Sequence, residues 1–281
     1  AVTVDVSGAG NIDLTGVTID TSGVDGSGGG GGSVTLETAD GTLTVDGIDT
    51  SGGTDTGTGG LAGTIGLTSG DTVSVDNATH DVTLVGTLTA LGGTGAVAGS
   101  ANTVTITADG ALVDGADGST LISGSTLTID AVTGVGTTGT GTIDTAVSTL
   151  DVDNTGTGVS GDIVITNTGA LLVTQIDQDG SGDVTLGGTG ITVTSGGSGI
   201  SAVGGTLQIN DGGGLTLNGT LTTVGGAIDV NASTGVDSTS ATTISTVGGA
   251  TSGAVTVHVS GAMHIDLTGV TIDTSGVDGS G

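Results

Sequence analysis

Residues 1–28 read AVTVDVSGAGNIDLTGVTIDTSGVDGSG, and residues 254–281 read AVTVHVSGAMHIDLTGVTIDTSGVDGSG. The two copies differ at three positions, where Asp5, Gly10 and Asn11 correspond to His258, Met263 and His264. A phrase that returns after 253 residues (254 − 1) is typical of a tandem repeat. We therefore expect residues 1–253 to form one repeat unit and residues 254–281 to begin the next copy.

Short runs inside and beyond this phrase alternate aliphatic and polar residues. Examples are VTVDV (2–6), VTLET (34–38), TVTITA (103–108), DIVITN (162–167) and ITVTS (191–195). Period-two alternation of β-branched residues predicts β-strands. Glycine accounts for 62 of the 281 residues, a density that disfavours helices. The sequence therefore predicts an all-β protein.

The composition also restricts the core. The chain has no aromatic residue, no proline and no cysteine, so its interior must be built from small aliphatic side chains. Such a thin core suits a β-solenoid, where each coil contributes few inward residues and neighbouring coils complete their burial. Strand-like runs begin at or near Val34, Ile65, Val82, Val104, Leu127, Ile143, Ile163, Val184, Leu207 and Ile228. We predict a solenoid of roughly 12 coils of about 21 residues per repeat, about 60 Å long.

Two glycine-rich stretches interrupt this rhythm, at residues 26–32 and 51–63. Each follows the local phrase IDTSG, at residues 19–23 and 48–52. Glycine permits tight backbone approach and positive φ at little steric cost. Both a flexible loop and a β-arch that leaves the solenoid are compatible with these stretches.

The charge excludes several classes of partner. The formal net charge is −29, and the chain contains no Lys or Arg. Without a basic surface, nucleic-acid binding is excluded and attraction to anionic lipid is disfavoured. No run of about 18 continuous apolar residues is present, so we expect no direct membrane insertion. The expected partners are divalent cations.

Two segments carry a resemblance to known families. The segment from Ile19 to Leu36, with IDTSG, a glycine-rich stretch and VTL, resembles filamentous-haemagglutinin-like repeats of large bacterial surface proteins. Residues 149–175, TLDVDNTGTGVSGDIVITNTGALLVTQ, resemble the repeats of giant bacterial adhesins. The resemblance implies a right-handed parallel β-helix that is exported or displayed at the cell surface, and it brings no catalytic motif. Typical adhesins contain Lys, Arg and aromatic residues, which favour recognition and are absent here.

One cluster of acidic residues is a candidate metal site. Asp177, Asp179 and Asp183 surround Gly and Ser in the sequence DQDGSGD. Closely spaced carboxylates around a tight turn favour Ca²⁺, which requires several oxygen ligands. The EF-hand pattern is incomplete because no Glu follows at its twelfth position. A solvated polar turn is the alternative.

The sequence favours architecture over catalysis. No Ser-His-Asp order or nucleophile elbow stands out, so we expect no enzyme. We expect a structural protein of an extracellular or cell-surface filament, such as a bacterial stalk, sheath or fibre. Its partners would be other copies of the same repeat, in the same chain or laterally. The alternative is the shaft of a giant adhesin whose receptor-binding module lies outside this sequence.

Overall fold

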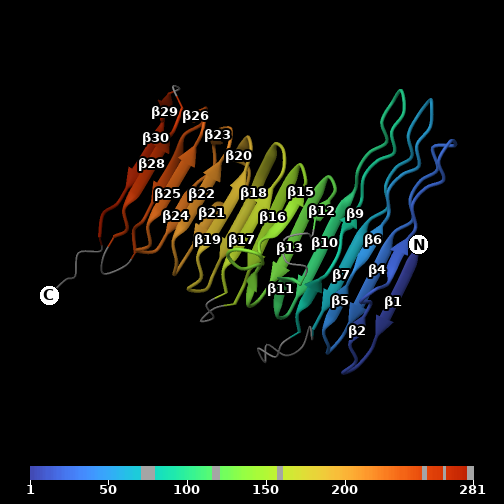
Figure 1. The fold of residues 1–281 in the computed structure, drawn as a ribbon. Helices are drawn as coiled ribbons and strands as arrows, with labels where there is room; N and C mark the ends of the chain where they lie inside the picture. Colours follow the sequence, from blue (N-terminus) through green and yellow to red (C-terminus); the bar gives the residue numbers. More distant parts are fainter. Residues whose placement is uncertain (71–79, 116–120, 157–160, 249–251, 262–263, 277–281) are drawn as a thin grey trace. The chain divides into compact units, whose positions relative to one another are not determined.

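The computed structural model describes residues 1–70, 80–115, 121–156, 161–248, 252–261 and 264–276, so Met263 lies outside the described residues (Figure 1). These ranges contain strands and turns and no helix. The chain divides into two compact units. Unit 1 consists of residues 1–132 and 136–148, and unit 2 consists of residues 133–135 and 149–281.

Each coil of unit 1 contributes a longer strand to one parallel sheet and shorter strands to a second. The first sheet stacks β1, β4, β7, β10 and β13 in that order, and the second contains the ladders β2-β5-β8-β11 and β3-β6-β9-β12-β15. The strands of unit 1 are β1 (Val2–Val6), β2 (Ile12–Asp13), β3 (Thr18–Asp20), β4 (Val34–Thr38), β5 (Leu43–Val45), β6 (Gly47–Asp49), β7 (Ile65–Ser69), β8 (Val82–Leu84), β9 (Leu88–Thr89), β10 (Thr103–Ala108), β11 (Ala111–Asp114), β12 (Leu121–Ser123), β13 (Thr126–Ala131) and β15 (Ile143–Ala146).

Unit 2 uses the same kind of coil. Five-residue strands form the ladder β17-β19-β22-β25-β28 in one sheet. The other sheet contains the longer strands β16 and β18, followed by the ladders of shorter strands β20-β23-β26-β29 and β21-β24-β27-β30. The strands of unit 2 are β14 (Gly134–Val135), β16 (Thr149–Asn154), β17 (Ile163–Asn167), β18 (Leu171–Gln178), β19 (Val184–Gly188), β20 (Ile191–Val193), β21 (Gly199–Ala202), β22 (Leu207–Asp211), β23 (Gly214–Leu217), β24 (Leu221–Thr223), β25 (Ile228–Ala232), β26 (Gly235–Asp237), β27 (Thr242–Ser245), β28 (Val255–Val259), β29 (Ile265–Asp266) and β30 (Val270–Asp273).

Strand β18 shows how one strand divides into two along unit 2. Its first part pairs with β20 and its second part pairs with β21. Its register with β16 shifts at Thr174, which has no partner position in β16. The Thr174 hydroxyl donates to the Leu150 carbonyl oxygen at 2.9 Å and holds this irregularity in place. One extra residue is a β-bulge, and it bends the strand at the point where the next coil turns.

The core consists of in-register columns of aliphatic side chains. In unit 1 Val34 pairs with Ile65, Ile65 with Val104 and Val104 with Leu127, and all four are buried. Burial of one such side chain stabilises the fold by about 1.5–3 kcal/mol. The residues that alternate with these four along the strands point outward, including Thr35, Thr105 and Thr128. The parallel β-solenoid predicted from the period-two alternation is thus confirmed within each unit.

The predicted coil length is right for part of the chain only. In unit 2 Val184 pairs with Leu207 and Leu207 with Ile228, which gives coils of 23 (207 − 184) and 21 (228 − 207) residues. The prediction of about 21 residues is wrong for the first three coils of unit 1. The pairs Val2–Val34, Val34–Ile65 and Ile65–Val104 give 32 (34 − 2), 31 (65 − 34) and 39 (104 − 65) residues.

The error has a physical cause. The runs that begin at Val82 and Ile143 belong to the second sheet, whereas Ile65 and Val104 belong to the first. Strands of both sheets alternate aliphatic and polar residues in the same way, so the spacing of runs mixes two ladders. Fewer coils than the predicted 12 therefore fit into residues 1–253. The right hand of the helix remains a prediction from the family resemblance.

Candidate functional site

Three glycine-rich arms leave the first three coils of unit 1, and Figure 1 shows them as long loops beyond the strands. We define arm 1 as residues 21–32, arm 2 as residues 50–63 and arm 3 as residues 90–102. The arms are hydrogen-bonded to one another through their backbones. Gly23 N donates to Ser51 O at 2.7 Å, and Gly52 N donates to Leu91 O at 2.9 Å. The predicted alternative of an arch that leaves the solenoid is therefore right for both glycine-rich stretches.

Glycine backbones make up the interior of this arm stack. Gly53 N donates to Gly29 O at 2.8 Å, and Gly60 N donates to Gly53 O at 2.9 Å. Gly93 N then donates to Gly60 O at 2.9 Å, and Gly99 N to Gly93 O at 2.8 Å. These bonds connect the outgoing and returning legs of the arms and link each arm to the next. The arms are consequently ordered by main-chain hydrogen bonds, and their only buried aliphatic residues are Ala62 and Ala90, near the ends of arms 2 and 3.

Close approach explains why these positions are glycine. A Cβ atom on Gly60 would overlap Gly29 O, and a Cβ on Gly99 would overlap Gly60 O. The hydrogen bonds Gly23 N to Ser51 O and Gly52 N to Leu91 O place residues 24, 53 and 93 at equivalent positions. Arms 2 and 3 have Gly there, facing the arm before them. Arm 1 has no arm before it in unit 1 and carries Val24, which is 73% exposed.

The opposite face of the stack follows the same rule. The bonds Gly31 N to Leu61 O and Gly59 N to Val97 O make residues 28, 59 and 98 equivalent. A Cβ on Gly28 would overlap Thr58 O of arm 2, and one on Gly59 would overlap Gly93 O of arm 3. Arm 3 carries the exposed residue Ala98 at this position. The equivalent positions are therefore glycine where another arm follows and carry a side chain on the outer arm of the stack. Leu61 and Val97 add further exposed apolar surface.

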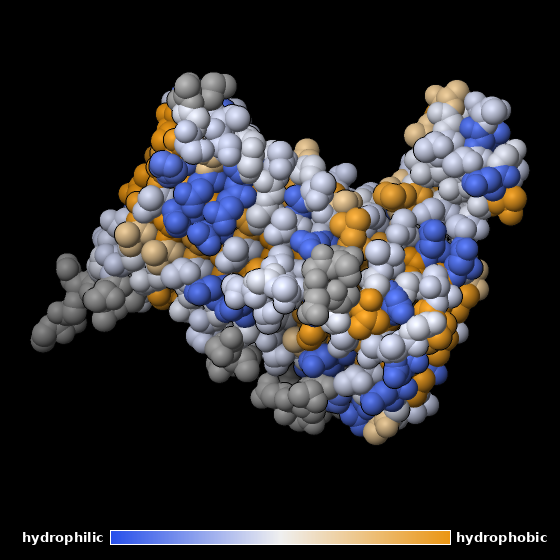
Figure 2. All heavy atoms as spheres, in the orientation of Figure 1, coloured by the Kyte–Doolittle hydropathy of each residue, from blue (hydrophilic) through white to orange (hydrophobic). Residues whose placement is uncertain are grey.

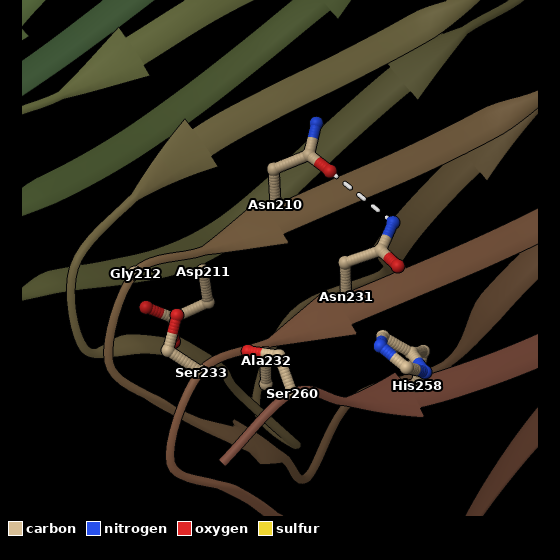
Figure 3. Close-up of a pocket in the computed structure, with 8 residues that line it drawn as sticks. All are labelled: Asn210, Asp211, Gly212, Asn231, Ala232, Ser233, His258 and Ser260. Atoms are coloured by element: carbon tan, nitrogen blue, oxygen red, sulfur yellow. Dashed lines mark hydrogen bonds between the residues drawn. The ribbon is translucent and has the colours of Figure 1, made fainter.

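A polar column crosses the longer strands at the end of unit 2. Asn210 on β22, Asn231 on β25 and His258 on β28 occupy paired positions. Figure 3 shows Asn231 Nδ2 donating to Asn210 Oδ1, at 3.2 Å, with His258 on the following strand. These residues line a shallow depression of about 300 Å³. The amide, hydroxyl and imidazole groups of Asn210, Asn231, Ser233, His258 and Ser260 can donate and accept hydrogen bonds there, and Asp211, Gly212 and Ala232 complete the lining.

Asp211 lies beside this column and has a structural task. Its side chain is buried, and Oδ1 accepts from Gly190 N at 2.8 Å and from Gly213 N at 2.7 Å. Its Oδ2 accepts from Ile191 N at 3.0 Å. A buried carboxylate needs such compensation because desolvation is costly. The three donors are Gly190 N, just before β20, Ile191 N, at the start of β20, and Gly213 N, just before β23. Asp211 therefore fixes two successive corners and does not face the depression as a free ligand.

His80 joins three coils in unit 1. Its Nε2 lies 3.0 Å from Asp40 Oδ1, and its Nδ1 lies 3.6 Å from Asp109 Oδ2. His80 Nδ1 and Asp109 Oδ2 are buried without hydrogen-bond partners. The His80 carbonyl oxygen accepts from the Ser69 hydroxyl at 2.6 Å. No short-range motif in the sequence predicts this cluster, because the arms separate its residues by long and unequal distances along the chain.

The predicted calcium residues lie around the end of β18. The pKa of Asp177 is raised by burial and, to a smaller extent, by the charge of Asp179. Asp183 Oδ1 accepts from Thr206 N at 2.7 Å and serves the next coil. No three His, Asp or Glu side chains within the described ranges are grouped so that they could hold a metal ion. Calcium binding by Asp177, Asp179 and Asp183 stays a prediction.

Several exposed carboxylates end strands through a local turn. Asp13 accepts from Thr15 N and the Thr15 hydroxyl, at 2.9 and 2.7 Å. Asp20 accepts from Ser22 in the same way, at 2.9 and 2.6 Å. These hydrogen bonds lower the pKa of both carboxyl groups. Some of the acidic residues of the chain thus stabilise the turns at the ends of strands.

In the part of the chain that the structure describes, no helix has the length and apolar character needed to cross a membrane.

No protein-family model, no curated protein and no solved structure matches this chain.

Proposed function

We propose that this protein is a structural component of an extracellular or cell-surface filament built from tandem β-solenoid repeats. One observation carries the proposal. The phrase shared by residues 1–28 and 254–281 folds into the same coil in both units, as a five-residue strand followed by two short ones. A coil that recurs with the repeat lets the ladder of hydrogen bonds continue from one repeat to the next.

The chemistry of the solenoid suits such a role. Its buried columns are Val, Ile, Leu and Ala, whose packing needs neither a cofactor nor a disulfide. Stability in a stacked array grows with each interface between neighbouring coils. The charge of −29 opposes non-specific association between fibres and makes their lateral packing sensitive to cations.

Location on the cell tests the filament role. Gold-labelled antibodies raised against residues 1–253 should decorate filaments on the surface of the producing cells at regular intervals. Deletion of the coding sequence should remove both the label and the filaments. Label confined to the cell interior, or filaments that persist without the protein, would refute the proposal.

Cations provide a second test. Millimolar Ca²⁺ should bundle the fibres, because divalent ions bridge carboxylates of neighbouring chains, and turbidity should rise and reverse with a chelator. Turbidity that does not change across this range would contradict the proposed role of cations as partners.

The arms favour a second candidate function, the shaft of an adhesin. Their exposed Val24, Leu61 and Val97 form apolar surface on a stack held by its own hydrogen bonds. If the arms contact another cell surface, Leu61→Asp with Val97→Asp should reduce binding of the chain to target cells. Leu172→Asp, at an exposed leucine of unit 2, is the matched control and should leave binding unchanged.

A further inference from the structure

The His80 cluster of unit 1 contains two buried polar atoms that lie close together and are not hydrogen-bonded. His80 Nδ1 lies 3.6 Å from Asp109 Oδ2, a distance too long for a hydrogen bond. Neither atom has a hydrogen-bond partner, and the His80 side chain is 9% exposed. Buried polar atoms in folded proteins are almost always hydrogen-bonded, so this pair requires a physical explanation.

The backbone fixes the positions of both residues. Asp109 N donates to Ser69 O at 3.0 Å, and Gly110 N donates to His80 O at 3.1 Å. The Ser69 hydroxyl donates to the same His80 oxygen at 2.6 Å. Gly70 has a φ of +105°, and a Cβ atom there would overlap Asp109 Cβ and lie 3.0 Å from His80 Cβ. The approach of the two side chains is therefore built into the turns after β7 and β10.

A neutral imidazole cannot satisfy both of the carboxylates that approach His80. The neutral ring has one N–H donor and one acceptor nitrogen. Nε2 lies 3.0 Å from Asp40 Oδ1, so a proton on Nε2 leaves the lone pair of Nδ1 beside the Asp109 carboxylate. The other tautomer moves the same conflict to Asp40. An imidazolium donates from both nitrogens and can serve Asp40 and Asp109 at once.

We propose that His80 takes up a proton in the folded protein and then bridges Asp40 and Asp109, as a pH-dependent clamp. Asp40 follows β4, His80 precedes β8 and Asp109 follows β10, so the clamp joins three successive coils of unit 1. Each of its two contacts is a charge-assisted hydrogen bond, which is stronger than a neutral one. The clamp does not depend on the filament function.

The charged groups around His80 determine the direction of the pH dependence. Among the described residues, the acidic side chains in the turns around the ring are Asp40, Asp81 and Asp109. Asp81 Oδ1 accepts from Ala111 N at 2.8 Å and so has its own partner. The clamp stabilises the fold while the ring is charged. Its contribution is therefore present at the acid end of the range in which histidine titrates and is lost as the pH rises through that range.

Urea unfolding of three chains at about pH 5.5 and about pH 8 tests the clamp. For the unsubstituted chain, the equilibrium constant of unfolding should be about tenfold larger at the higher pH, because deprotonation leaves buried groups unpaired. Asp109→Asn should lose this difference, because the new amide can donate to Nδ1 of the neutral ring. Asp229→Asn removes the same charge from an outward position of β25 and should keep the difference.

The matched control is needed because other groups titrate as well. Figure 2 shows hydrophilic residues on the visible surface of each unit, and His264 is also exposed. Asp109→Asn and Asp229→Asn each lose one carboxylate and keep His264. The difference between these two variants therefore reports the clamp alone.

Nitrogen NMR of the imidazole rings provides a readout that needs no change at Asp109. The His80 signals, identified by their loss in His80→Gln, should show two protonated nitrogens at about pH 5.5. This measurement decides if Asp109→Asn does not fold. A His80 ring that stays neutral at this pH, or equal pH dependence of Asp109→Asn and Asp229→Asn, would overturn the clamp. Neither result would affect the surface labelling that tests the filament function.

Discussion

Units 1 and 2 enclose similar aliphatic columns with coils of very different length. In unit 1 the first three coils need 32, 31 and 39 residues, by the spacing of Val2, Val34, Ile65 and Val104. In unit 2 the coils from Val184 to Ile228 need 23 and 21 residues. Each of these three coils of unit 1 carries one of the arms, which hold together through glycine backbones. Chain length therefore changes outside the core, and the stacked columns are maintained in both units.

The largest effect on the free energy of unfolding is expected from substitutions in the aliphatic columns, which each unit contains. Leu67→Ala in unit 1 and Leu186→Ala in unit 2 each remove a buried side chain with aliphatic partners in both neighbouring strands. Each should cost about 2–5 kcal/mol, measured by urea unfolding and hydrogen exchange of the surrounding strands. The exposed Leu172→Ala should cost less than about 0.5 kcal/mol. A much smaller loss at Leu67 than at Leu186 would mean that long coils pack more loosely.

The next effect separates the arms from the columns. Gly60→Ala would force a Cβ against Gly29 O, so arm amides such as those of Gly53 and Gly93 should exchange at least about tenfold faster. Gly30→Ala is the matched control in arm 1, because its Cβ would meet Leu61 O at an ordinary 3.6 Å. Core strands should keep their protection in both variants. Equal exchange in the two variants would contradict an arm interior that requires glycine.

A smaller effect is expected at Asp177 in unit 2. Burial, and then the charge of Asp179, raises the pKa of Asp177, so the ionised form destabilises the folded state at neutral pH. This penalty should be relieved as the pH falls through the raised pKa. Asp177→Asn should therefore stabilise the protein at pH 7 by about 0.5 kcal/mol or less, because solvent screens a partly exposed group. The gain should disappear in acid; a gain that persists there would contradict the electrostatic cause.

The smallest effect concerns the exposed turn carboxylates of unit 1. Hydrogen bonds from Thr15 and Ser22 lower the pKa of Asp13 and Asp20, so their contribution to stability is present above the unfolded pKa. It should be lost as the pH falls through the lowered folded pKa. Carboxyl titration by NMR should give values below the ordinary aspartate range, and Thr15→Val should move Asp13 back toward it. If the pKa of Asp13 did not change in the Thr15→Val variant, the hydrogen bonds from Thr15 would not be the cause of the lowered pKa.

Much of the fold could be predicted from the sequence, but little of the arm stack and of the His80 cluster could. The starts of all ten predicted strand-like runs lie within strands of the structure, because period-two alternation directly reports an inward and an outward face. The sequence does not predict which runs belong to which sheet, since Val82 and Val104 stand in runs of the same composition. It does not predict arm 3 either, because residues such as Val97 and Ala98 interrupt the glycine-rich composition of that arm. The His80 cluster depends on three coils of unequal length, which no local pattern encodes.

Electron cryo-microscopy of straight filament segments tests the central claim most directly. Stacked coils of tandem repeats should give a meridional reflection near 4.8 Å, together with a longer axial period set by the 253-residue repeat, marked by the projecting arms. Segments without the 4.8 Å reflection, or separate globules without axial order, would contradict a filament built from this solenoid.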